Sequence, residues 1–163
     1  ARVIGIAGGP EKCRWLLEHA NFDEAIDYKN ESVSDRLKAL CANSIDLFFD
    51  NVGGQILDDV LTNLSVGARV LLCGGISSGY TANNLPPGPI NYMQLVIRRA
   101  TMQGFLVLDY LDQFPDALEE MHSWVNQGLI HVEEDVIDGL QHAPSTLAGL
   151  FEGKNFGKQL LKL

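Results

Sequence analysis

The sequence predicts an α/β fold built on parallel strands. Short apolar runs alternate with amphipathic stretches several times along the 163 residues, without tandem repeats or low-complexity segments. Three of the apolar runs end in glycine-rich or polar turns, at residues 7–9, 50–54 and 73–77. The carboxyl ends of parallel strands share one edge of a sheet, and ligands of open α/β sheets bind outside that edge. The three turns therefore predict one ligand crevice.

The first half of the chain is predicted to be regular β-α-β structure. Strands are expected at residues 2–7, 25–28, 45–50 and 68–73, and helices at residues 10–20, 33–40 and 53–64. Pro10 suits the first turn of a helix, and Ser32 is a good helix N-cap. The run 45–50 is nearly continuous in apolar residues, so we expect it to be covered on both faces. Asp58 and Asp59 fall on the solvent side of their helix by spacing.

The second half begins with a loop. Gly79, paired asparagines and the Pro-Pro-Gly-Pro run favour a loop over residues 76–90. A helix is expected over 92–99, a strand over 102–108 and a long helix from 114 to a stop at Gly128. Beyond it the pattern predicts a strand at 135–137, a helix at 144–152 and a strand at 158–163. We therefore predict two domains, residues 1–128 and 129–163.

The glycine-rich turns also bear on which part of a nucleotide-binding fold is present. In such folds a G-x-G-x-x-G turn follows the first strand and cradles a diphosphate. The sequence contains no such turn, because Gly8-Gly9 lacks the third spaced glycine. We interpret the opening as the second crossover unit of a Rossmann-type sheet that lacks its first strand. Two central strands would then keep unpaired backbone, and we expect the chain to be inactive alone.

Composition narrows the function classes. The chain has 12 basic and 21 acidic residues and a formal net charge of −9, with no basic cluster, which argues against nucleic acid or an anionic membrane surface as a partner. The absence of a long apolar run and of a signal peptide predicts a cytoplasmic protein. The cysteines and histidines are isolated and no H-E-x-x-H or G-x-S-x-G motif occurs, so we expect neither a metal site nor hydrolase chemistry.

The end of the first predicted strand indicates which nicotinamide cofactor the protein prefers. A strand that selects NAD usually ends in an acidic residue that binds the ribose 2′-hydroxyl. Here the strand ends in Ala7-Gly8-Gly9, and Lys12 and Arg14 follow, so a 2′-phosphate fits better. In the 76–90 loop, the Tyr80 hydroxyl is the candidate to meet a substrate or a nicotinamide ribose, although a packed loop aromatic is an equal alternative.

Several segments in order resemble one family. They are residues 2–12, 26–29 (IDYK), 49–54 (FDNVGG), 73–77 (CGGIS), 87–89 (PGP), 104–105 (GF) and 155–158 (NFGK). Together they are similar to the zinc-independent medium-chain dehydrogenases/reductases, in the branch of prostaglandin reductases, plant alkenal double-bond reductases and curcumin-reductase-like proteins. The resemblance implies NADPH-dependent reduction of the C=C bond of an α,β-unsaturated aldehyde or ketone, with hydride going to the β carbon and no zinc.

The same resemblance implies roles for individual residues. Lys12 and Tyr28 would contact the adenosine 2′-phosphate beside Gly8, and Asn51 would lie at the diphosphate and ribose side. The remaining expected cofactor contacts are Cys73, Gly74, Ile76, Ser77, Phe105, Leu106, Val107 and Asn155, with Tyr80 near the nicotinamide ribose. The strand 102–108 resembles an edge through which the family forms homodimers.

Three other functions stay open. A quinone reductase of the same superfamily shares the fold. A non-catalytic NADP-binding module, such as a sensor, would also carry these turns. A methyltransferase is a weaker alternative, because its nucleoside site favours an acidic residue at the end of the second strand of the sheet. The first strand of this chain is interpreted as that second strand, and it ends in Gly8 and Gly9 instead.

Overall fold

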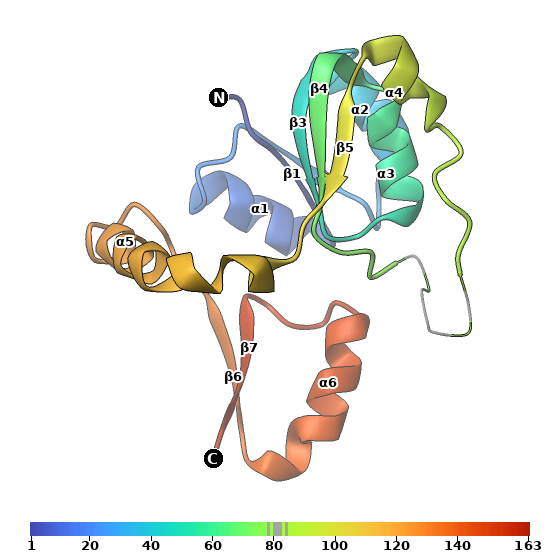
Figure 1. Ribbon diagram of the computed structural model, residues 1–163. Coiled ribbons are helices and arrows are strands. Elements are labelled where there is room, and N and C mark those ends of the chain that lie inside the picture. The colour runs from blue at the N-terminus through green and yellow to red at the C-terminus, as the bar shows by residue number, and fades with distance from the viewer. Residues whose placement is uncertain (78, 80–82, 84) are drawn as a thin grey trace. The chain divides into compact units, whose positions relative to one another are not determined.

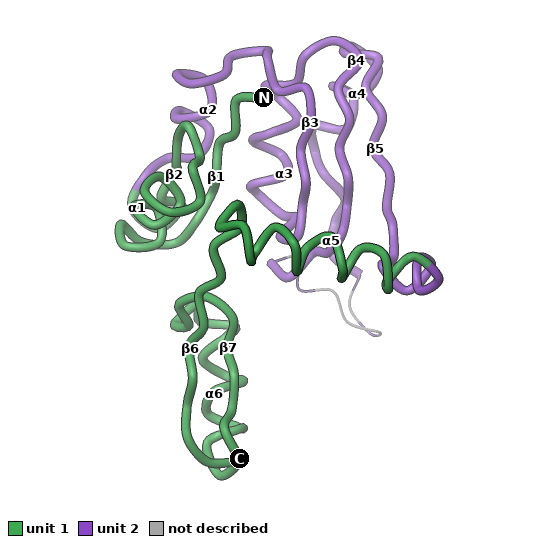
Figure 2. Tube along the Cα trace, turned by 90° about the vertical axis from the view of Figure 1, so that its left-hand side faces the viewer, with its two compact units in different colours: residues 1–30, 113–163 green, residues 31–112 purple. Residues whose placement is uncertain are grey.

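The structure is a computed structural model that describes residues 1–77, 79, 83 and 85–163 (Figure 1). It shows the predicted α/β architecture with parallel strand pairs. The chain forms two compact units, the first made of residues 1–30 and 113–163 and the second of residues 31–112 (Figure 2). This division differs from the predicted boundary at residue 128, which stays a prediction. No helix in the described part of the chain has the length and apolar character to cross a membrane.

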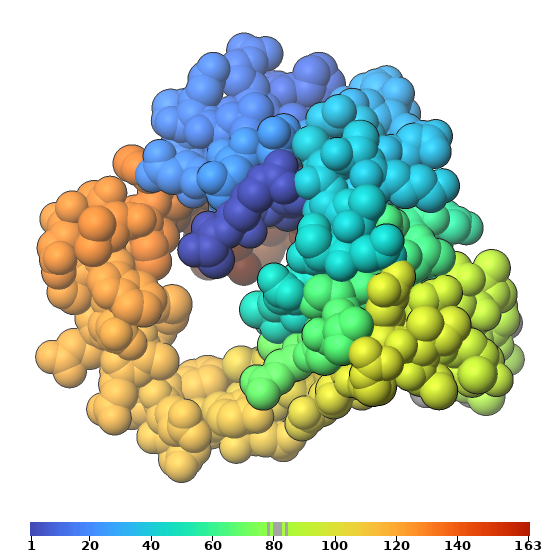
Figure 3. Space-filling view, turned by 90° about the horizontal axis from the view of Figure 1, so that it is seen from above, coloured from blue at the N-terminus to red at the C-terminus, as the bar shows by residue number. Residues whose placement is uncertain are grey.

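The second unit is a three-stranded sheet covered by helices on one face. Its strands are β3 (Ile45–Asp50), β4 (Leu64–Leu72) and β5 (Thr101–Gly104), in the order β3-β4-β5, and its helices are α2 (Val33–Cys41), α3 (Gly54–Leu61) and α4 (Met93–Arg98). Figure 1 shows the three helices on the same side of the sheet. The core lies between these layers, where Val60, Leu61, Leu64 and Val70 are at most 1% exposed. Helix α4 contacts β4, and Figure 3 shows the two in yellow-green and green.

The other face of this sheet is open, which corrects one expectation. Leu47 and Phe49 of β3 point to the same face and are 61% and 51% exposed. The prediction that residues 45–50 are covered on both faces is therefore wrong for the described structure. An apolar strand indicates burial in the complete fold, whereas coverage depends on elements that the strand itself does not encode.

Helix α3 ends earlier than predicted. The predicted helix ran through Leu64, but α3 stops at Leu61 and the fully buried Leu64 already begins β4. Side chains end the helix: Thr62 Oγ1 and Asn63 Nδ2 both donate to the Asp59 carbonyl, at 2.8 and 2.9 Å. Helix α2 begins as expected, because Ser32 Oγ accepts a hydrogen bond from the Asp35 amide at 3.3 Å.

The predicted strand 102–108 is also shorter. Strand β5 ends at Gly104, and a 3-10 helix, η1, follows at Val107–Gln113. The reason lies in the neighbouring strand, since Phe105 N donates to Leu72 O at 3.1 Å and Leu72 is the last residue of β4. Residues after Phe105 have no strand beside them to continue the ladder.

The first unit holds two separate strand pairs. Strand β1 (Ile4–Ala7) pairs in parallel with β2 (Glu24–Asp27), with α1 (Pro10–Glu18) between them in sequence. Helix α5 (Phe114–Asn126) ends before Gly128 as predicted. Strand β6 (Glu134–Asp138), the short η2 (Leu140–His142), α6 (Ala143–Phe151) and β7 (Lys158–Lys162) follow, and β6 pairs in parallel with β7. Strands β1 and β3 belong to different sheets.

Candidate functional site

In the second unit, the turns that follow β3 and β4 are joined by backbone hydrogen bonds. Cys73 N and Gly74 N both donate to Asp50 O, at 2.8 and 3.1 Å. Ile76 N donates to Asn51 O at 3.3 Å, and Ser77 N to Val52 O at 3.0 Å. We call residues 50–54 and 73–77 the double turn. It brings together five of the predicted cofactor residues: Asn51, Cys73, Gly74, Ile76 and Ser77.

These hydrogen bonds restrict what the double turn can offer a ligand. The amides of Cys73, Gly74, Ile76 and Ser77 already have acceptors within the protein. Ser77 Oγ also donates, to Val52 O at 2.7 Å. The groups left to contact a ligand from residues 73–77 are therefore mainly carbonyl oxygens, side chains and the lone pairs of the Ser77 hydroxyl.

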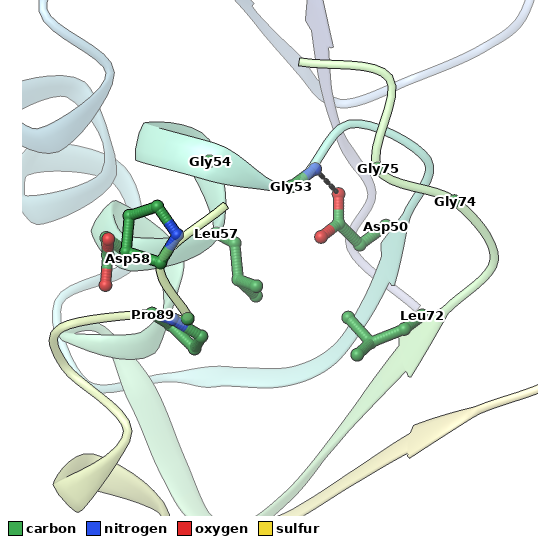
Figure 4. A pocket seen from close by; sticks show the side chains of 11 residues that line it. Asp50, Gly53, Gly54, Leu57, Asp58, Leu72, Gly74, Gly75 and Pro89 are labelled. Atoms are coloured by element: carbon green, nitrogen blue, oxygen red, sulfur yellow. Dashed lines mark hydrogen bonds between the residues drawn. The ribbon is translucent and has the colours of Figure 1, made fainter. Parts of the chain in front are cut away.

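Asp50 fixes the first half of the double turn. Its side chain is fully buried, and its Oδ1 accepts the amides of Val52 and Gly53 at 2.8 and 2.9 Å. Figure 4 shows the hydrogen bond from Gly53. It thereby supplies the cap that α3 lacks, since the N-cap residue is Gly53. Its Oδ2 is buried without a hydrogen-bond partner in the described structure. The predicted cofactor residues include Asn51 but not Asp50, although an aspartate that ends an apolar strand three residues before a glycine pair can cap the helix that follows.

A cavity of about 200 Å³ lies beside the double turn. Its walls come from the ends of β3 and β4, the first turns of α3 and the Pro-Gly-Pro segment 87–89 (Figure 4). Asp50, Leu57 and Leu72 contribute side chains to it. The cavity is open at one side and combines apolar walls with a buried carboxylate, which suits a small group that carries a hydrogen-bond donor.

Asp58, which also lines this cavity, is placed differently from our expectation. It was predicted on the solvent side of its helix, but only 9% of it is exposed. Its Oδ1 accepts the Asn91 amide at 3.0 Å, and its carbonyl accepts Asn91 Nδ2 at 3.2 Å. Asp58 therefore anchors the segment that leads from the Pro-Gly-Pro run into α4. The helical spacing alone could not show that a later segment covers this side of α3.

In the first unit, the side chains of Lys12, Tyr28 and Lys29 lie near Gly8 or near Gly153. Lys12 and Tyr28 are predicted cofactor residues, and Lys29 follows Tyr28 in the sequence. A Cβ atom built on Gly8 would lie 2.8 Å from Tyr28 Oη and 2.9 Å from Lys29 Cε. Lys12 Nζ donates to the carbonyl of Gly153 at 2.8 Å. A Cβ on Gly153 would lie 3.8 Å from Tyr28 Oη and 3.7 Å from Lys29 Nζ. We call Gly8, Lys12, Tyr28, Lys29 and Gly153 the cationic cluster.

Asp27 holds this region in shape. Its carboxylate is buried, with Oδ1 accepting the amides of Gly9 and Lys29 at 2.7 and 3.0 Å and Oδ2 accepting Asn30 Nδ2 at 2.7 Å. The Asn30 hydrogen bond, followed by that from Gly9, keeps the pKa of Asp27 below its usual value. Through these hydrogen bonds the ionised Asp27 ties the backbone at Gly9 to the turn that carries Lys29 and Asn30. In the sequence, Asp27 is recognisable only as part of the IDYK motif, so its role in ordering this turn was not predicted.

The other predicted residues lie in different parts of the chain. Phe105 follows β5, and its ring centroid is 5.8 Å from that of Phe49. Leu106 and Val107 are exposed, and the Leu106 carbonyl accepts the Asp109 amide at 3.0 Å. Asn155 belongs to the first unit and donates to Gly157 O at 2.8 Å. Tyr80 lies outside the described residues. Within the described part of the chain, no group of His, Cys, Asp and Glu side chains could hold a metal ion.

Comparison with known proteins gives a consistent result. A family model described as zinc-binding dehydrogenase matches residues 1–123. The NADPH-dependent curcumin reductase of Escherichia coli is 40% identical over 99% of the chain and 48% of its own length. The NADP(+)-dependent 2-alkenal reductase of Nicotiana tabacum is 41% identical over 98% of the chain and 46% of its own length. The chain thus spans about half the length of the curated relatives it matches.

Solved structures agree with the fold. The crystal structure of Vibrio vulnificus CurA in complex with NADPH superposes with a TM-score of 0.88 and 44% identity, covering 99% of the chain and 49% of CurA. Escherichia coli quinone oxidoreductase complexed with NADPH reaches a TM-score of 0.82 at 21% identity, covering 100% of the chain and 50% of that structure, which shows a shared fold. The predicted Rossmann-type α/β class is confirmed by these matches. Together with the turns and parallel strands described above, these matches show that the chain belongs to the zinc-binding dehydrogenase family, in the medium-chain branch of alkenal and curcumin reductases.

Proposed function

We propose that the protein carrying this chain uses NADPH to reduce the C=C bond of α,β-unsaturated aldehydes or ketones. The observation that carries the cofactor choice is the cationic cluster. Strand β1 ends at Ala7 without an acidic residue, and the Tyr28 hydroxyl and the Lys29 side chain lie against the following Gly8. Lys12 binds the carbonyl of Gly153, which Tyr28 and Lys29 also approach. Positive charge at this place favours a phosphorylated adenosine ribose over a free 2′-hydroxyl.

The chain's residues fit such a cofactor. Because Gly8 has no Cβ atom, the Tyr28 hydroxyl and the Lys29 side chain can come close to the backbone of the turn after β1. In the second unit, the double turn offers Asn51 and the exposed residues 73–77 at the carboxyl ends of β3 and β4, where ligands of open α/β sheets bind. Asp50 Oδ2 is buried and has no hydrogen-bond partner in the described structure, which leaves one carboxylate acceptor unsatisfied beside the cavity.

In the proposed reaction the protein binds, orients and stabilises charge. NADPH, when bound, supplies the hydride. Lys12 and Tyr28 hold the adenosine end, and Asn51, Cys73 to Ser77 and Asn155 are proposed contacts along the rest of the cofactor. The backbone of Phe105, Leu106 and Val107 is proposed to meet the carboxamide. Tyr80 is our candidate for a hydroxyl that contacts the substrate or the nicotinamide ribose, where it would help to stabilise the developing enolate oxygen.

The substrate class rests on the relatives. Two proteins about 40% identical to this chain are named for curcumin and 2-alkenal, and a third, from Mentha piperita, is named (+)-pulegone reductase at 39% identity. A 2-alkenal carries a C=C bond conjugated with its carbonyl. The quinone reductase alternative has support at the level of the shared fold, from a structure only 21% identical.

The function is tested on the protein at its native length. NADPH oxidation is followed with 2-hexenal and with a benzoquinone as separate substrates, and the products are identified by mass spectrometry. We expect hexanal from 2-hexenal, and NADPH to serve better than NADH. Turnover of the quinone alone would favour the quinone reductase. Tight NADPH binding without turnover of either substrate would favour a non-catalytic module.

We also propose that the 163-residue chain alone does not turn over substrate. Strands β1 and β3 belong to separate sheets, Leu47 and Phe49 lie exposed, and the relatives are about twice as long. Turnover by the isolated chain would contradict this. We further propose a cytoplasmic homodimer joined at the β5 edge of its sheet, where, among the described strands, β5 pairs with β4 alone. A monomeric mass of the native-length protein in light scattering would reject the dimer.

A further inference from the structure

The Lys29 side chain lies close to two glycines, Gly8 and Gly153. Lys38, Lys154 and Lys162 each form an ion pair with an acidic side chain. Lys29 takes part in none of the ion pairs found in the described part of the chain. Its side chain instead extends past Gly8, with Cε 2.9 Å from where a Cβ of that glycine would lie. Its ammonium group lies near Gly153, 3.7 Å from the position of a Cβ there.

The Asp27 carboxylate fixes the backbone at Lys29. The Asp27 carboxylate accepts the Lys29 amide at 3.0 Å, which fixes the backbone of the turn after β2. The same carboxylate also binds the Gly9 amide and the Asn30 side chain, so hydrogen bonds from three groups engage it. Asp27 therefore orders the backbone of Lys29. Besides the Asn30 hydrogen bond, the positive charge of Lys29 also helps to lower the pKa of Asp27, but no ion pair in the described structure joins the Asp27 and Lys29 side chains.

We infer that Lys29 is a second cation of the adenosine 2′-phosphate site and helps to determine the preference for NADPH over NADH. This inference rests on the proposed function. A phosphate monoester carries a charge of about −1.5 to −2 at neutral pH, more than one lysine balances. Lys12 already gives one of its three N–H groups to Gly153 O. Lys29 supplies the remaining charge, and the Tyr28 hydroxyl, which like Lys29 lies close to Gly8 and Gly153, supplies a neutral donor.

The segment around Gly153 is part of this site. Gly153 lies far from Gly8 in sequence, yet the Gly153 carbonyl accepts a hydrogen bond from Lys12. Tyr28 and Lys29 also lie close to Gly153. The cationic cluster is thus closed on one side by the turn after α6 (Ala143–Phe151). The chain has a net charge of −9, so the local positive charge of this cluster attracts an anionic ligand to this site rather than to the rest of the surface.

The test is a binding titration of the native-length protein, which needs no turnover. Dissociation constants are measured by calorimetry for NADPH, NADH, 2′,5′-ADP and 5′-AMP. The variants are Lys29→Gln, Lys29→Arg, Lys12→Gln and the control Lys162→Gln, whose lysine is exposed and paired with Asp138 at 3.7 Å. We expect Lys29→Gln to bind NADPH and 2′,5′-ADP about tenfold more weakly, as loss of one charged hydrogen bond gives. Binding of NADH and 5′-AMP should not change, which also shows that the variant is folded.

The outcomes separate this inference from the proposed function. Lys29→Arg should keep most of the NADPH affinity, and the salt dependence of NADPH binding should become weaker in Lys29→Gln. If the unmodified protein prefers 2′,5′-ADP while Lys29→Gln binds it as tightly as Lys162→Gln does, the role of Lys29 is refuted and the cofactor proposal stands. If the unmodified protein binds 2′,5′-ADP and 5′-AMP equally, both the cofactor proposal and the role of Lys29 are wrong.

Discussion

Replacing Gly54 by alanine tests whether the two halves of the double turn depend on each other. Gly54 has a φ of +58°, and a Cβ there would lie 2.8 Å from Ser77 Oγ. A non-glycine residue in the left-handed region costs about 1–2 kcal/mol. The hydroxyl must also move, which breaks its 2.7 Å hydrogen bond to Val52 O, at a cost of about 1 kcal/mol. The expected destabilisation is therefore about 2–3 kcal/mol.

The matched control is Gly67→Ala. Gly67 has a φ of +80°, but a Cβ there meets nothing within 4 Å, so this variant measures backbone strain alone. A double-mutant cycle completes the test, because in a Ser77→Ala background Gly54→Ala should lose only the strain. Urea unfolding followed by circular dichroism gives the free energies. If Gly54→Ala costs no more than Gly67→Ala, and the cycle shows no coupling, the double turn is not a joined unit.

Four further predictions concern single side chains. Asp50→Ala should cost about 2–4 kcal/mol in urea unfolding, because two amide groups lose their acceptor, while Asp50→Asn should cost less; equal losses would contradict the capping role. The lowered pKa of Asp27 adds stability above the unfolded pKa of about 3.9, and this stability is lost as pH falls through the folded value. Asp27→Asn should therefore lose less stability than the unmodified protein on acidification below about pH 4, and parallel curves would contradict this. Ser32→Ala should cost about 1 kcal/mol as a lost helix cap, measured the same way, and no loss would dismiss the cap. Tyr28→Phe should weaken NADPH binding a few-fold, roughly by one neutral hydrogen bond, and leave NADH binding unchanged, whereas equal weakening of both would point to a structural effect.

Local signals explain which elements could be predicted. Strand β3 and the Ser32 cap of α2 each depend on residues that are adjacent in the sequence, and both were predicted correctly. The boundary between α3 and β4 was missed because apolar residues continue across it and only two side-chain hydrogen bonds mark the stop. The end of β5 was missed because the length of its neighbour β4 determines it.

The candidate site shows the same division. Turns such as 50–54 and 73–77 are visible as glycines at strand ends, and their approach to each other follows from parallel pairing. The functions of Asp27 and Asp50 could not be assigned from their positions at strand ends, because a carboxylate there can equally bind a ribose or cap the backbone around it. The position of Lys29 beside Gly8 depends on how the turn after β2 folds back over β1, which no local pattern encodes.

The outer edge of β3 has a practical consequence for anyone who produces this chain. Its backbone groups on the side away from β4 form no ladder in the described structure, and Leu47 and Phe49 stand next to them. Such an edge is a template for intermolecular strand addition. The chain expressed by itself should consequently form aggregates or inclusion bodies despite its acidic surface. A co-expressed polypeptide that donates a parallel apolar strand should keep it in solution.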